Sequence, residues 1–134
     1  MNRARHLIFA GVLIGAGLPA QAQAIAGPIG GALFAQHCAA CHQTNASGTA
    51  GLAPPLKGAY WAQLGSDRGY LPSVLVYGLS GKIEMEAGQP FLGSMPAFGA
   101  VLDDGSLAAL ATHVRQLQGF ASEPAYEAAD VQAV

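Results

Sequence analysis

The stretch Cys38-Ala39-Ala40-Cys41-His42 constrains this chain more than any other feature of its sequence. Residues three and four apart share one face of a helix, so a helical turn here places two thiols and one imidazole on the same side. The chain has only two cysteines, both in this stretch, so neither has a thiol partner elsewhere. We therefore expect Cys38, Cys41 and His42 to belong to one site.

Four kinds of site fit two cysteines followed by a histidine. A structural zinc site needs about four ligands, yet the other histidines beyond the N-terminal segment, His37 and His113, form no second cluster. A thioredoxin-like redox site belongs to a βαβ context, which this glycine-rich helical sequence does not offer. A disulfide suits an oxidising compartment but leaves His42 without a role, whereas covalent haem attachment uses all three residues. We therefore predict haem attachment at Cys38 and Cys41, with a disulfide as the main alternative.

Residues 1–24 have the pattern of an export signal. A basic start precedes an apolar run, Leu7 to Leu18, that is too short to span a membrane comfortably, and small-residue cleavage sites follow. We predict a signal peptide over residues 1–24 that directs the chain to the periplasm, with an uncleaved membrane anchor as the alternative. The rest divides into one domain, 25–120, and a flexible acidic tail, 121–134. After cleavage we expect no stable membrane span.

Removing the signal makes the chain more acidic. Without Arg3 and Arg5, four basic residues face all eight acidic ones, which gives a net charge near −4. No basic patch remains to neutralise phosphates, so nucleic acid binding is disfavoured and we expect none. The negative balance favours a partner with a basic surface.

Apolar periodicity predicts an all-α fold. One helix runs through Leu33 and Phe34 into the cysteine motif, and another begins near Leu71-Pro72. The stretch from Gly88 to Ala97 is expected to be irregular. The clearest helix starts at the capping residue Asp103 and stops at Gly119. Its apolar stripe consists of Leu107, Leu110, Ala111, Val114 and Leu117.

From about Gly30 to Gly119 the chain resembles a class I c-type cytochrome. The residues that carry the resemblance are Gly30, Phe34, the cysteine motif, Ala53-Pro54-Pro55-Leu56-Lys57-Gly58, Tyr77-Gly78-Leu79-Ser80-Gly81, and Gly88-Gln89-Pro90-Phe91 leading to Met95-Pro96-Ala97-Phe98. The resemblance implies the cytochrome c fold, with roughly three to five short helices around one covalently attached haem. One departure stands out, because His113 takes the place of the aromatic residue that usually meets Phe34.

The iron of such a haem needs two axial ligands. His42 follows the second attachment cysteine and is the first candidate. For the other side we favour Met95, which stands in an irregular loop before a proline and gives the histidine–methionine pair of electron-transfer haems. Met85 and His113 are the alternatives, although a methionine at position 85 is more typical of core packing.

Further residues are candidates for the haem pocket. By resemblance, the carbonyl of Pro54 accepts a hydrogen bond from Nδ1 of His42. Trp61 and Arg68 have groups suited to a haem propionate, although an ordinary surface arginine is the alternative for Arg68. The candidate walls, which are equally typical of a generic core, are Leu56, Leu71, Leu75, Ile83 and Phe98.

The predicted function is electron transfer by a single-haem carrier, not enzymatic catalysis. Two filled axial positions leave no open site for a substrate. We expect transient docking to redox partner proteins such as a dehydrogenase or oxidase. The alternatives are a haem c subunit of a larger periplasmic dehydrogenase or oxidase, a haem sensor or peroxidase-like enzyme with an open iron position, and a structural module without haem.

Overall fold

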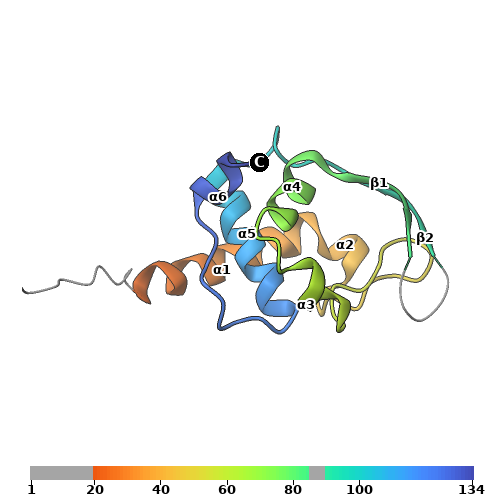
Figure 1. Ribbon diagram of the computed structural model, residues 1–134, viewed down its shortest axis with the longest axis horizontal. Coiled ribbons are helices and arrows are strands. Elements are labelled where there is room, and N and C mark those ends of the chain that lie inside the picture. The colour runs from red at the N-terminus through yellow and green to blue at the C-terminus, as the bar shows by residue number, and fades with distance from the viewer. Residues whose placement is uncertain (1–19, 85–89) are drawn as a thin grey trace, which may run out of the picture.

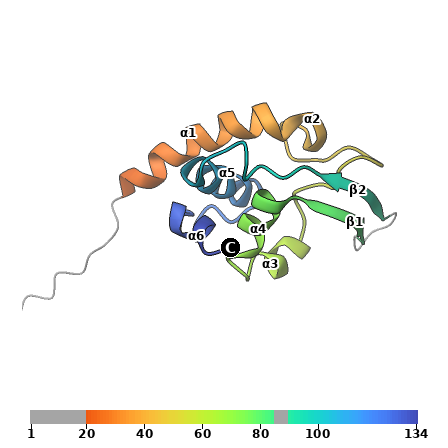
Figure 2. The same cartoon turned by 90° about the horizontal axis from the view of Figure 1, so that it is seen from above.

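The computed structural model describes residues 20–84 and 90–134, which form a mostly helical molecule with one small sheet (Figures 1 and 2). Most of the predicted signal peptide, and Met85, lie outside the described residues. None of the described helices is long and apolar enough to cross a membrane. The elements are α1 (Ala20–His37), α2 (Ala39–His42), α3 (Tyr60–Leu64), α4 (Tyr70–Tyr77), β1 (Leu79–Ile83), β2 (Phe91–Met95), α5 (Asp104–Leu117) and α6 (Ala128–Gln132).

The core lies where α5 packs against α1. As predicted, Asp103 caps α5, accepting a hydrogen bond from the Ser106 amide at 2.7 Å. Gly119, with φ 97°, follows the end of this helix. A Cβ at Gly30 would overlap the carbonyl oxygen of Ala109, so the glycine allows the two backbones to approach closely. The buried side chains of this core include Phe34, Leu75, Leu107, Leu110, Ala111 and Val114.

A two-stranded antiparallel sheet is the element that the sequence prediction missed. β1 pairs with β2, with Leu79 opposite Met95 and Ile83 opposite Phe91. Only the residues at the ends of each strand are half-buried, and the middle pair is Gly81 and Gly93. Without alternating apolar residues, these strands carry little of the signal by which a strand is recognised.

Residues 121–134, expected to be a flexible tail, pack onto the helical core. Tyr126 and Val131 are buried, and α6 lies against α5 and α4. The buried hydroxyl of Thr112 donates to the Ala108 carbonyl and accepts the Tyr126 amide, both at 2.9 Å. The tail is therefore part of the domain, because buried apolar side chains and ion pairs to distant residues offset the cost of ordering it.

Candidate haem site

The cysteine motif forms the turn between α1 and α2. The amides of Cys41 and His42 both donate to the Cys38 carbonyl, at 3.2 and 2.9 Å, so the motif is helical as predicted. Cys38 is buried, Cys41 is exposed, and no disulfide joins them. Burial, with a smaller contribution from Cys41, raises the pKa of the Cys38 thiol to about 11. Before any attachment, this thiol is therefore protonated at neutral pH.

The imidazole of His42 is buried and held in one orientation. Its Nδ1 lies 3.0 Å from the Pro54 carbonyl oxygen, which confirms the predicted contact. A carbonyl only accepts hydrogen bonds, so Nδ1 carries the proton and Nε2 keeps its lone pair. Burial lowers the pKa of His42, an effect partly opposed by the bond to Pro54. The ring is thus disposed to be neutral, which is the form that ligates a metal.

The loop that brings Pro54 to His42 folds back on α2. Thr49 pairs with Ala53 in an isolated bridge, and its hydroxyl donates to the Cys41 carbonyl at 2.8 Å. The Leu56 amide donates to the carbonyl of Ala46, a fully buried residue. These bonds fix the proline segment without any regular secondary structure of its own.

Met95 is half-buried at the end of β2, where its segment is fixed on both sides. On one side its backbone pairs with Leu79 in β1. On the other side the Phe98 amide donates to the Leu75 carbonyl at 2.9 Å, which ties the segment to α4. A Cβ at Gly78, whose φ is 75°, would overlap the Met95 carbonyl oxygen, so the methionine segment lies directly on the end of α4.

The predicted wall residues lie around this region with different burial. Leu75 and Phe98 belong to the buried core, and Leu56 and Leu71 are partly buried against it. Ile83 is half-buried at the far end of β1, opposite Phe91 and outside that core cluster. His113, an alternative ligand, instead packs its ring on Phe34.

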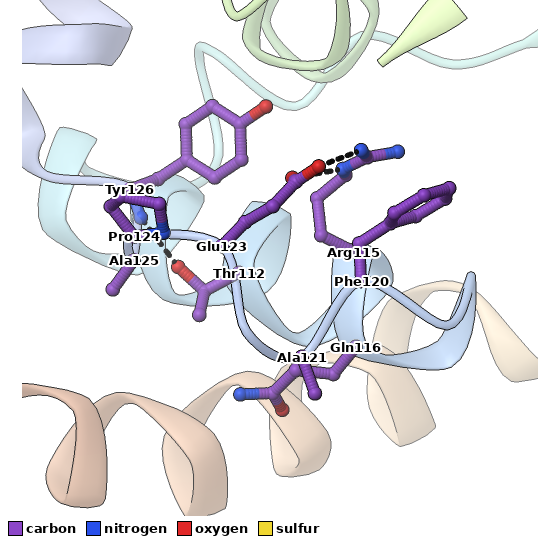
Figure 3. A pocket seen from close by; sticks show the side chains of 9 residues that line it. All are labelled: Thr112, Arg115, Gln116, Phe120, Ala121, Glu123, Pro124, Ala125 and Tyr126. Carbon is purple, nitrogen blue, oxygen red and sulfur yellow. Dashed lines mark hydrogen bonds and ion pairs between the residues drawn. The ribbon is translucent and has the colours of Figure 1, made fainter. Parts of the chain in front are cut away.

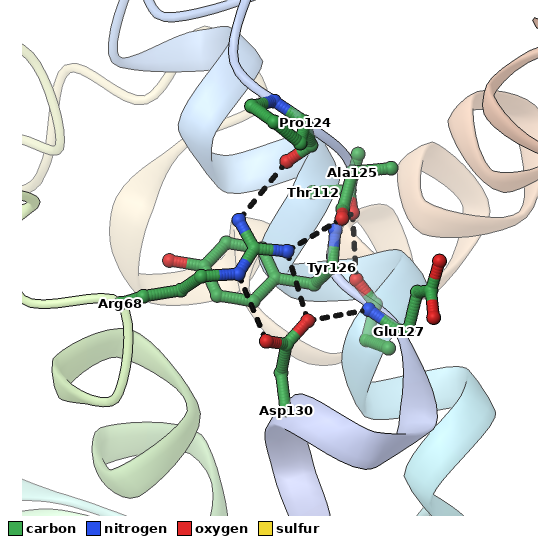
Figure 4. Close-up of polar contacts among 8 residues, drawn as sticks. Arg68, Thr112, Pro124, Ala125, Tyr126, Glu127 and Asp130 are labelled. Carbon is green, nitrogen blue, oxygen red and sulfur yellow. Dashed lines mark hydrogen bonds and ion pairs between the residues drawn. The ribbon is translucent and has the colours of Figure 1, made fainter. Parts of the chain in front are cut away.

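Trp61 and Arg68, the two propionate candidates, have different environments. The indole Nε1 of Trp61 is a buried donor that lacks a hydrogen-bond partner within the described part of the chain. Arg68 is fully engaged with the tail: it donates to Asp130 at 2.8 Å and to the carbonyls of Pro124 and Ala125 (Figure 4). The structure therefore corrects the prediction for Arg68, whose guanidinium anchors the tail.

One buried charged residue was not singled out by the sequence interpretation. Arg115 is only 4% exposed, and it contacts both α3 and the tail. The available signal was a charged residue directly after Val114 in the apolar stripe of α5. Such a residue is rarely buried unless it is paired.

These residues fit a covalently attached haem. Two thiols on one helical turn supply the attachment points, and the Nε2 of His42 offers a lone pair. A buried indole N–H without a partner among the described residues has the chemistry to donate to a propionate. When bound, the haem supplies one-electron redox chemistry at its iron.

Comparison with known proteins agrees with this site. The family model "Cytochrome c" matches residues 29–118. A cytochrome c-552 from Thermus thermophilus is 40% identical over 102 residues, which cover 75% of this chain and 67% of that protein. Another cytochrome c-552 from Thermus thermophilus is 41% identical over 96 residues, covering 70% and 71% of the two chains. The chain therefore belongs to the cytochrome c family, and it carries covalently bound haem c.

Proposed function

We propose that this protein is a periplasmic carrier of one electron, with His42 and Met95 as the axial ligands of its haem iron. The hydrogen bond from Nδ1 of His42 to the Pro54 carbonyl at 3.0 Å is the observation that carries the proposal. It fixes the ring and its tautomer, and such outer contacts raise the basicity of a metal-ligating histidine. Membership of the cytochrome c family supports electron transfer by haem c. The proposed pair of axial ligands adds how the iron is coordinated.

Met95 is supported as the sulfur ligand by the way its segment is held. β1 and the end of α4 fix its backbone from two sides, so a thioether there needs little ordering on binding. A thioether opposite a histidine raises the reduction potential compared with two histidines. With both axial positions filled, oxygen and substrates have no open coordination site.

The test compares the two methionines other than Met1. Met95→Ala and its matched control Met85→Ala are purified with haem, and a pyridine haemochrome spectrum verifies covalent attachment in each. We expect Met95→Ala to lose the ferric methionine–iron absorption band and to bind carbon monoxide when reduced, whereas Met85→Ala keeps the band. A band that survives Met95→Ala and disappears in Met85→Ala would overturn the ligand assignment.

The carbon monoxide measurement also separates the carrier from the sensor or peroxidase-like alternative. A filled sixth position predicts that the reduced wild-type protein binds carbon monoxide weakly or not at all. Rapid, stoichiometric binding by the wild type contradicts the carrier proposal, because sensors and peroxidases need an open or displaceable position.

We also propose export to the periplasm and transient contact with a redox partner. The apolar run and small-residue sites before residue 25 support export. Among residues 31–66, Lys57 is the only lysine, arginine, aspartate or glutamate. Helices α5 and α6 and the loop between them carry four carboxylates, two of which, those of Glu123 and Asp130, pair with arginines. Helix α6 lies away from α2 (Figures 1 and 2), so we expect the negative charge at this end of the molecule to act on a basic partner at long range and not within the contact.

Fractionation and purification at low and high salt test these two proposals. Haem protein in a periplasmic extract, of the mass that cleavage before residue 25 predicts, supports export, and a product retained in the cytoplasm contradicts it. Electron-transfer rates that fall modestly with ionic strength support the long-range contribution. Stable co-purification with a larger dehydrogenase or oxidase favours the alternative of a dedicated haem subunit.

A further inference from the structure

Helix α3 has little apolar packing to fix its position. It spans five residues, Tyr60–Leu64, and none of them is buried. A helix this short is not stable alone in water, so its place in the molecule depends on tertiary contacts. Trp61 belongs to this helix, and its indole N–H is buried and unpartnered among the described residues.

Polar contacts hold α3 from two directions. The hydroxyl of Tyr60 donates to the carbonyls of Pro55 and Lys57, at 2.6 and 3.1 Å, which links α3 to the loop that orients His42. From the other direction, Nη1 of Arg115 donates to the Trp61 carbonyl at 3.2 Å. Trp61 therefore stands between the histidine loop and α5.

Arg115 is itself fixed by residues that follow α5, including one of the tail. Its Nε and Nη2 donate to the two carboxylate oxygens of Glu123, at 2.9 and 2.7 Å (Figure 3). Its Nη1 also donates to Gln118 at 2.7 Å, and its guanidinium lies 4.0 Å from the centroid of the Phe120 ring. A two-pronged arginine–carboxylate pair fixes geometry more strictly than a point charge does.

Gly65 lets the guanidinium lie directly beneath the end of α3. A Cβ at this position would overlap the guanidinium carbon and both terminal nitrogens of Arg115. The φ of Gly65 is −77°, which any residue adopts, so the glycine is needed for space and not for backbone conformation. The close approach of Arg115 to α3 thus depends on the missing side chain at Gly65 as well as on the arginine.

We propose that Arg115, held by Glu123, is a positioning residue that keeps the indole N–H of Trp61 directed at a haem propionate. The proposal rests on the haem site described above and extends it to the tail. A donor on a propionate disperses negative charge near the iron, so losing it stabilises the ferric state and lowers the reduction potential. Arg115 acts through the Trp61 backbone and touches neither haem nor iron in this role.

The test is a double-mutant cycle that changes no charge. Gly65→Ala displaces Arg115 from α3, and Trp61→Phe removes the N–H donor. We expect each single variant to lower the reduction potential, and we expect Gly65→Ala to cause no further shift in the Trp61→Phe background. Trp61 is the only tryptophan, so its haem-quenched fluorescence gives a second readout, which should rise in Gly65→Ala as the indole moves.

Matched controls separate positioning from general stability. Gly105→Ala is also a glycine-to-alanine change, but it lies in α5 with only Asp103 nearby, so we expect no shift in potential. Asp130→Asn weakens the other arginine–carboxylate pair of the tail and should reduce stability without moving the potential. If Gly65→Ala folds poorly, Arg115→Lys provides the same cycle, because a lysine keeps the charge but cannot make all four hydrogen bonds.

Two results would overturn the proposal. An unchanged potential and fluorescence in Gly65→Ala or Arg115→Lys would mean that Arg115 only stabilises the fold. If either variant shifted the reduction potential equally with Trp61 and with Phe at position 61, Arg115 would act by a route that does not involve the indole N–H. A pyridine haemochrome spectrum of every variant distinguishes these results from failure of the haem site itself, which would abolish the spectrum.

Discussion

The imidazole of His113 packs on the ring of Phe34, with ring centroids 5.5 Å apart and planes inclined at 56°. This contact joins α5 to α1 at the position where the resemblance led us to expect a second aromatic residue. The histidine retains a tilted ring pair of the kind that aromatic residues form. Unlike phenylalanine, the histidine places a titratable group in the contact between the two helices. Burial lowers the pKa of His113.

Replacing His113 by phenylalanine should therefore stabilise the protein, and more so in acid. We expect a gain of about 1 kcal/mol at pH 7.5 from the aromatic pair. Because the folded pKa is below the unfolded value of 6.5, the unfolded wild type binds a proton first. Its stability should fall as the pH drops through 6.5 and then level off below the folded pKa.

Denaturant titrations of both proteins between pH 7.5 and 5 test this prediction. The other histidines are common to both proteins and cancel in the difference. A stability difference between the His113→Phe variant and the wild type that stays constant over this range would contradict the assigned pKa shift.

Two adjacent glycines in α1 should respond in opposite directions to alanine. A Cβ at Gly30 would overlap the Ala109 carbonyl oxygen, whereas one at Gly31 would only touch the His113 ring at 3.4 Å. We expect Gly30→Ala to lose about 1–3 kcal/mol through overpacking. Gly31→Ala should gain roughly 0.5–1 kcal/mol from its better helix propensity. Thermal melts of the two variants test this prediction. A melting temperature of Gly30→Ala equal to that of the wild type would contradict the close approach of the two helices.

The ion pair between Arg68 and Asp130 should make the tail sensitive to acid. The hydrogen bond from Arg68 is the main reason that the pKa of Asp130 is lowered from 3.8. The pair therefore stabilises the fold above pH 3.8, and this contribution is lost as the pH falls through the folded pKa. We expect Asp130→Asn to cost up to about 1 kcal/mol at pH 7, since the pair is partly exposed.

Stability curves of Asp130→Asn and wild type should converge at low pH. Asp67→Asn is the matched control, because it removes the same charge and an asparagine oxygen still accepts the Gly69 amide. A gap that persists below the folded pKa would show that Asp130 acts by something other than its charge.

Local features of the site were predictable from the sequence. The spacing of Cys38, Cys41 and His42 is itself the motif, and the cap and stripe of α5 lie within one continuous segment. The hydrogen bond between His42 and Pro54 also followed from resemblance. Each of these depends on residues near one another in the chain or on a recurrent family pattern.

Two of the missed features, the packed tail and the contact of Arg115 with α3, depend on pairs that are far apart in sequence. The tail looks mobile by composition, yet Arg68 and Asp130, 62 residues apart, hold it in place. The two strands of the sheet lie close together in sequence, but they contain glycine and have no apolar alternation by which a strand is recognised. Arg115 contacts Trp61, 54 residues away. No local propensity encodes such contacts, because tertiary packing decides them.

Residues 120–134 pack against α4 and α5, and Arg115 contacts α3. A chain that is made from its amino end therefore completes these contacts last. The attachment turn at 38–42 is then made well before Arg115 and residues 120–134, which pack later. Cys38 is buried in the same cluster as residues of α5 and the tail, so its burial is complete only after those later residues have packed.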